Sequence, residues 1–117
     1  MKLIKKLLVA SAVSGLVLTS SIASDMDLVK KGEKIFNTKN LGNCLACHDA
    51  NGKNIEGPGS MGPKLQYLSA WPEEALYEKV YNPYTTNPIS QMPAFGKSGW
   101  LSDGEIKAVV AYLKTIN

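Results

Sequence analysis

The sequence contains one histidine, two cysteines and no arginine among its 117 residues. Every basic residue is a lysine, and three of these lie within the first six positions. Residues 25–117 therefore carry ten lysines against ten carboxylates. Because this part has no excess positive charge and no basic stretch, we do not expect it to bind nucleic acid. Alternating strand patterns are also missing, which indicates an all-α class.

The three scarce residues occur together in one segment, Cys44-Leu45-Ala46-Cys47-His48. A Cys-x-x-Cys-His segment is the attachment site of a c-type haem. The spacing suits the chemistry, because two thiols add to the two vinyl groups and the adjacent histidine binds the iron. We therefore expect Cys44 and Cys47 to hold one covalent haem c, with His48 as an axial ligand of its iron.

Three other uses of these residues remain open. A thioredoxin-like thiol pair would require a strand before it in a βαβ unit, and the sequence shows none. A structural zinc site needs four ligands, and the chain offers only three cysteines and histidines. A disulfide across two intervening residues would be strained. Haem attachment is the interpretation we favour.

The second axial ligand must come from another residue type, because no further histidine exists and the haem uses both cysteines. Methionine, lysine or an open position remain. Among Met26, Met61 and Met92 we favour Met92, because Pro93 biases it toward an extended backbone that can hold a thioether against iron. Met61 is the second choice, although most methionines fill cores. A His–Met iron is expected to have a raised potential.

The N-terminal segment has the pattern of a secretory signal peptide. Three lysines precede an apolar stretch over residues 7–18, and Ser21-Ile22-Ala23 suits signal peptidase. We expect residues 1–24 to be removed and residues 25–117 to form one periplasmic domain without a membrane span. The apolar stretch is shorter than the about 20 residues that a span needs, although an uncleaved anchor remains an alternative.

Three helices are predicted after the signal peptide. The first covers about residues 27–38, and the second follows Pro72, a favourable first-turn residue. The third follows Ser102-Asp103-Gly104-Glu105, which has the pattern of a capping box. Apolar residues recur at helical spacing in each of these segments.

Two long loops, residues 51–62 and 82–99, are rich in glycine and proline. Long irregular loops are uncommon in compact domains unless they serve a function. Wrapping a cofactor is one such function, and a haem would also enlarge the core of a small domain. We expect Trp71 and Trp100 to pack in the core rather than at the haem edge.

This layout resembles a class I cytochrome c. It has an N-terminal helix with Gly32, the Cys-x-x-Cys-His segment, Gly62-Pro63-x-Leu65, a Met-Pro strap and a terminal helix. The resemblance implies an all-α class I cytochrome c domain at residues 25–117, with three or more helices and long loops around one covalent haem. It also implies that the Pro63 carbonyl accepts a hydrogen bond from His48.

Residues 42–48, 57–63 and 87–96 are together similar to SoxX, the monohaem cytochrome subunit of the bacterial sulfur-oxidation system. Ala94 departs from the second proline that many relatives carry. The resemblance implies a SoxA-like dihaem or monohaem partner, in a complex that couples thiosulfate to a cysteine of a carrier protein. Because haem attachment leaves no free thiol here, we expect no catalytic residue on this chain. It would instead accept electrons and pass them to a small soluble acceptor.

Two other functions remain open. A freely diffusing class I cytochrome c that feeds a terminal oxidase would share the fold, the cofactor and the ligands. A haem sensor or peroxidase would leave the sixth position of the iron open and would lack a methionine ligand.

Overall fold

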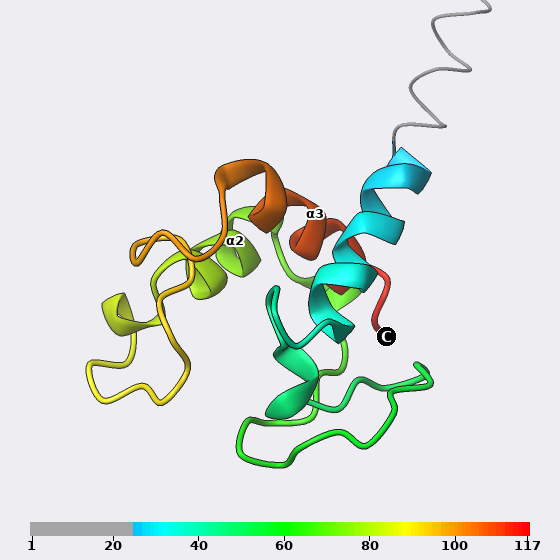
Figure 1. Cartoon of the computed structure of the whole chain (residues 1–117), viewed down its shortest axis with the longest axis horizontal. Coiled ribbons are helices and arrows are strands. Elements are labelled where there is room, and N and C mark those ends of the chain that lie inside the picture. Colours follow the sequence, from blue (N-terminus) through cyan, green and yellow to red (C-terminus); the bar gives the residue numbers. More distant parts are fainter. Residues whose placement is uncertain (1–24) are drawn as a thin grey trace, which may run out of the picture.

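The computed structural model describes residues 25–117, which form α-helices joined by long loops (Figure 1). The first helix covers residues 25–37, α2 covers Glu73–Tyr81 and α3 covers Asp103–Leu113. The all-α prediction is confirmed, and each predicted helix lies within a few residues of its expected position. The predicted signal peptide lies outside the described residues.

Shorter elements occur in the loops. The 3-10 turns are Cys44–Ala46, Leu68–Ala70 and Pro83–Thr85. The part of the chain described here contains no β-strand, and only an isolated parallel bridge joins Ala50 to Leu65. No helix within it combines the length and apolar character that a bilayer crossing requires.

The first helix crosses α3 at Gly32. A Cβ atom on Gly32 would lie 1.9 Å from the carbonyl oxygen of Ala108 and 2.9 Å from the Cβ atom of Tyr112. The two backbones are therefore in direct contact at this point. One turn along the first helix, Phe36 packs on Tyr112 with ring centroids 5.3 Å apart. Gly32 and Phe36 therefore place the first helix directly against α3.

Replacing Gly32 with Ala is expected to lower the free energy of unfolding by about 3 kcal/mol. The added methyl group overlaps a backbone carbonyl, so the helices must separate, and the better helix propensity of alanine offsets only about 1 kcal/mol. Denaturant unfolding measures the change. Gly104→Ala is the matched control, because it lies in α3 with no atom within 4 Å of its Cβ position. Equal unfolding midpoints for the two variants would contradict this account.

α3 begins at the capping box that the sequence predicts. The Ser102 N–H donates to Glu105 Oε1 at 2.9 Å, and the Glu105 N–H donates to Ser102 Oγ at 3.2 Å. The Tyr77 hydroxyl donates to Asp103 Oδ1 at 2.6 Å, which joins α2 to the first turn of α3. This bond is the main cause of the lowered pKa of Asp103, and Lys107 lowers the pKa further.

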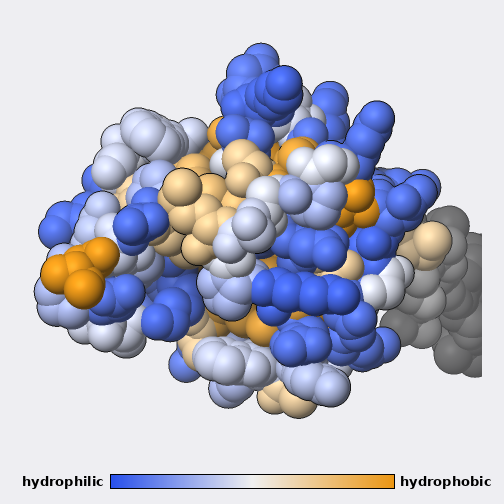
Figure 2. Space-filling model, turned by 90° about the horizontal axis from the view of Figure 1, so that it is seen from below, coloured by the Kyte–Doolittle hydropathy of each residue, from blue (hydrophilic) through white to orange (hydrophobic). Residues whose placement is uncertain are grey.

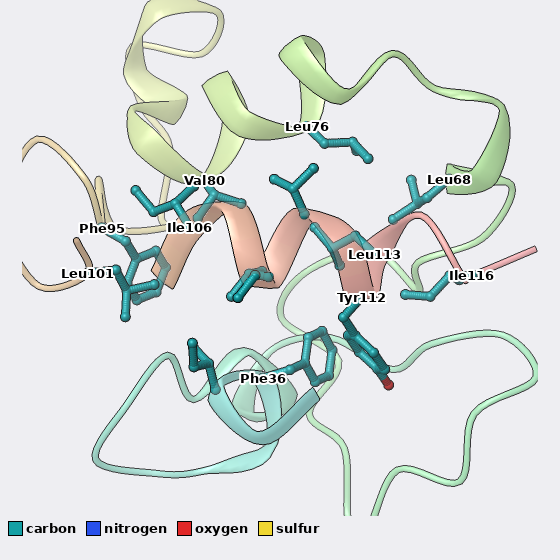
Figure 3. Packing of buried hydrophobic residues seen from close by; sticks show 14 of the residues in the cluster. Phe36, Leu68, Leu76, Val80, Phe95, Leu101, Ile106, Tyr112, Leu113 and Ile116 are labelled. Atoms are coloured by element: carbon teal, nitrogen blue, oxygen red, sulfur yellow. The ribbon is translucent and has the colours of Figure 1, made fainter. Parts of the chain in front are cut away.

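Buried apolar residues from the three helices and the adjoining loops form one core. Figure 3 shows α3 between the first helix, which contributes Phe36, and α2, which contributes Leu76 and Val80. The largest fully buried side chains are Phe36, Ile106, Val109 and Ile116. Because α3 contacts both other helices, it is the central element of the domain.

The expectation that both tryptophans pack in the core is wrong. Trp71 is 45% exposed and Trp100 is 64% exposed. Trp100 contacts Phe95 edge to face, with centroids 5.8 Å apart, while the rest of its ring lies at the surface. The space-filling view shows that hydrophobic groups reach the surface in patches among hydrophilic ones (Figure 2). Both tryptophans sit at the ends of short connecting segments, where no helical period directs a side chain inward.

Candidate functional site

The Cys-x-x-Cys-His segment folds as a single tight turn. Asn43 precedes it with φ 52°, in the left-handed region that asparagine tolerates better than most residues. The backbone N–H groups of Cys47 and His48 both donate to the Cys44 carbonyl, at 3.2 and 2.9 Å. Both thiols are free and partly buried. The turn therefore brings the two cysteines and the histidine together, as haem attachment requires.

The imidazole of His48 is oriented by Pro63. Its Nδ1 lies 2.7 Å from the Pro63 carbonyl oxygen. A carbonyl can only accept, so Nδ1 carries the proton and donates. The other ring nitrogen, Nε2, then keeps its lone pair for a metal, which is the arrangement usual for metal-bound histidines.

The glycine-rich loop at residues 57–63 packs against the Cys-x-x-Cys-His turn through backbone hydrogen bonds. The Gly59 N–H donates to the Leu45 carbonyl at 2.9 Å, and the Gly62 N–H donates to the Cys47 carbonyl at 2.8 Å. A Cβ atom on Gly59 would lie 1.7 Å from the carbonyl oxygen of Ala46, so only glycine permits this approach.

Gly62 lies directly against the histidine ring. A Cβ atom at this position would lie 2.4 Å from Cε1 of His48 and 2.8 Å from each ring nitrogen. Sequence reasoning identified Pro63 but missed the contacts of Gly59 and Gly62. Their only signal was the density of glycines in the loop, which does not say what the glycines approach.

The electrostatics of the turn do not suit thiolate chemistry. Burial raises the pKa of the Cys44 thiol to about 12. A redox-active thiol pair needs a lowered pKa, so the thioredoxin-like interpretation loses support. Within residues 25–117, no three Cys, His, Asp or Glu side chains converge on one ion position. The donor set thus suits a c-type haem better than a bare zinc ion.

The three methionines within residues 25–117 differ in burial. Met61 is 72% exposed and Met26 is 59% exposed. Met92 is partly buried and packs against the core. It lies in the loop between α2 and α3, and the described hydrogen bonds do not join it to the histidine turn. Figure 1 shows the Met92 loop, in yellow to orange, and the glycine-rich loop at residues 57–63, in green, in different parts of the molecule.

Comparison with known proteins supports the geometric interpretation. A family model described as "Cytochrome C oxidase, cbb3-type, subunit III" matches residues 27–113. A chain in the crystal structure of SoxXA from P. pantotrophus has the same fold, with a TM-score of 0.65 and 32% sequence identity. That match covers 74% of this chain and 79% of the other.

An uncharacterized lipoprotein of Aquifex aeolicus (strain VF5) is 39% identical over 74 residues, which is 62% of this chain and 35% of the relative. The match therefore spans about a third of the relative's length. The family model covers most of the described residues, and the solved structure shares their fold. This chain belongs to the c-type cytochrome family described as cbb3-type cytochrome c oxidase subunit III, and it is a class I, SoxX-like cytochrome.

Proposed function

We propose that this chain transfers electrons through one haem c, attached to Cys44 and Cys47, with His48 and Met92 as axial ligands of the iron. The haem supplies a site that gains and loses one electron. The observation that carries the proposal is the hydrogen bond from His48 to Pro63. This bond keeps the proton on Nδ1 and leaves the lone pair of Nε2 available for the iron.

Two methionines and two lysines are weaker candidates than Met92 for the sixth position. Met61 and Met26 are largely exposed, so neither is held by packing. Lys114 donates to two backbone carbonyls at 2.8 and 2.6 Å, and Lys53 lies over the Tyr112 ring. Met92 combines partial burial with a rigid proline on its C-terminal side. A histidine with a methionine gives the iron a raised reduction potential, which suits electron acceptance.

The biological role proposed is the electron-accepting subunit of a SoxXA-like S-thiosulfotransferase complex in the periplasm, after removal of residues 1–24. The similarity to a chain of the SoxXA structure supports this role. The cysteine count supports it as well, because a chain with both thiols bound to haem cannot carry a sulfur intermediate. A SoxA-like subunit would be the stable partner, and a small soluble protein would take the electrons.

A freely diffusing carrier that feeds a terminal oxidase is the second candidate, and the match to an oxidase-subunit family favours a link to an oxidase. Both candidates use the same haem and ligands, and they differ in whether a second cytochrome stays bound. Affinity purification from the native host separates them. A bound cytochrome partner supports the complex subunit, and an isolated haem protein that reduces an oxidase supports the carrier.

Met92→Ala is expected to remove the sixth ligand, which raises the spin state of the ferric iron and lowers the reduction potential. Absorption spectra and a potentiometric titration measure both effects. Met61→Ala is the matched control and is expected to behave as wild type, because its side chain is mostly in solvent. If Met61→Ala changes the spectrum and Met92→Ala does not, the ligand assignment must move to Met61.

A further inference from the structure

The segment around Met92 is held by the core on one side only. After Met92, Ala94 and Phe95 are 4% and 8% exposed, and the Phe95 carbonyl accepts two backbone N–H groups at 2.9 and 3.0 Å. Before Met92, residues 84–89 are all exposed, and Ile89 is 87% exposed. Packing therefore fixes the chain after the methionine, whereas residues 84–89 are held by hydrogen bonds rather than by burial.

Ser90 connects this exposed turn to Met92. Its hydroxyl accepts the Met92 N–H at 3.1 Å and donates to the Met92 carbonyl at 3.2 Å. One hydroxyl can do both, because it has a donor and two acceptor lone pairs. The Ser90 N–H in turn donates to the Asn87 carbonyl at 3.0 Å, and Asn87 Oδ1 accepts the Ile89 N–H at 3.3 Å. These bonds tie the exposed turn to both polar groups of the Met92 backbone.

We propose that Ser90 is a positioning residue that holds Met92 in place for the haem iron, an inference that rests on the proposed His48–Met92 ligation. Ordering a mobile segment costs conformational free energy, and a segment already ordered costs less when the ligand bond forms. Pro93 fixes φ on one side of the methionine and the Ser90 hydroxyl fixes the backbone on the other. Removing the Ser90 hydroxyl leaves the Met92 sulfur unchanged but lowers the fraction of protein in which this sulfur is bound to the iron.

Imidazole added to the ferric holoprotein competes with Met92 for the iron, so its apparent affinity reports how firmly the methionine is held. For Ser90→Ala we expect about tenfold tighter apparent imidazole binding, the effect of losing one or two hydrogen bonds. The near-infrared band that reports sulfur bound to ferric haem should weaken in parallel. Ser90→Thr keeps the hydroxyl and is expected to restore the wild-type affinity.

Ser98→Ala is the matched control. Ser98 is an exposed serine of the same loop, and its hydroxyl makes no hydrogen bond to any described residue. Equal imidazole affinities for Ser90→Ala and Ser98→Ala, with a changed affinity for Met92→Ala, would overturn the role of Ser90 and leave the ligation intact. Equal affinities for wild type and Met92→Ala would overturn both proposals.

Hydrogen exchange on the unmodified holoprotein gives an independent measurement. The Met92 N–H is expected to exchange more slowly than the N–H of the exposed neighbour Gln91, because the Ser90 hydroxyl accepts the Met92 N–H and no described residue accepts that of Gln91. A Met92 amide that exchanges as fast as that of Gln91 would overturn the proposal without any variant.

Discussion

Replacing both Cys44 and Cys47 with Ser is expected to abolish covalent haem and to leave residues 25–117 largely unfolded. A domain of this size has a marginal core, and a cofactor is one of the usual ways to make it stable. The loops between the helices add few large buried side chains, chiefly Leu68, Phe95 and Leu101. They therefore depend on the haem for something to pack against.

Three measurements on one preparation test this prediction. Extraction with acidified acetone should remove all pigment from the double variant and none from wild type. Far-ultraviolet circular dichroism should show the loss of helix, and thermal unfolding should lose its cooperative transition. Met61→Ala serves as the control, because it changes an exposed side chain and leaves both thiols in place. A colourless double variant that still unfolds cooperatively would show that the three helices form a stable core without haem.

The helices could be predicted from the sequence because their signals are local. Pro72 precedes α2, and the Ser102–Glu105 capping box marks the start of α3 within a residue. Apolar residues recur at helical spacing in α2, and two of them, Leu76 and Val80, are buried in the structure. Each signal concerns residues within one or two turns of one another, so no knowledge of the tertiary fold was required.

The loop contacts could not be predicted, because they depend on where distant segments meet. No short-range sequence pattern predicts that Gly59 approaches the backbone of Ala46, or that Gly62 lies against the ring of His48. The contact between Ser90 and Met92 spans only two residues, yet a Ser-x-Met sequence has no fixed conformation. The exposure of Trp100 was missed for the same reason, since general residue preferences favour burial and only the fold places this ring outside.

Gly62→Ala is expected to disturb the candidate haem site directly, because the added methyl group would meet the ring of His48. The φ of Gly62 lies outside the left-handed region, so alanine can adopt the backbone conformation without strain. The difficulty is steric, because the methyl group would lie 2.4 Å from Cε1 of His48. Either the imidazole rotates and lengthens its 2.7 Å bond to the Pro63 carbonyl, or the loop withdraws from the turn.

Both responses weaken the same site. A rotated ring no longer aims Nε2 along the direction fixed by Pro63, and a displaced loop breaks the 2.8 Å bond from Gly62 to the Cys47 carbonyl. We expect a loss of about 2–3 kcal/mol in unfolding free energy, the usual cost of overpacking a tight contact. We also expect a shifted reduction potential and a fraction of high-spin haem. Potentiometry and absorption spectra on the purified variant measure these effects beside the unfolding curve.

The control separates a crowded histidine from a generally disturbed fold. Gly104→Ala adds the same methyl group where no atom lies within 4 Å, so its potential and spin state should match wild type. Gly32→Ala, in contrast, should lose stability at the helix crossing while the iron keeps its ligands. The contrary outcome is a Gly62→Ala variant with lowered stability but with a potential and a spectrum equal to those of wild type. In that case the contact between Gly62 and His48 stabilises the loop but does not orient the imidazole. The orientation of the imidazole would then depend on Pro63 without help from its neighbour.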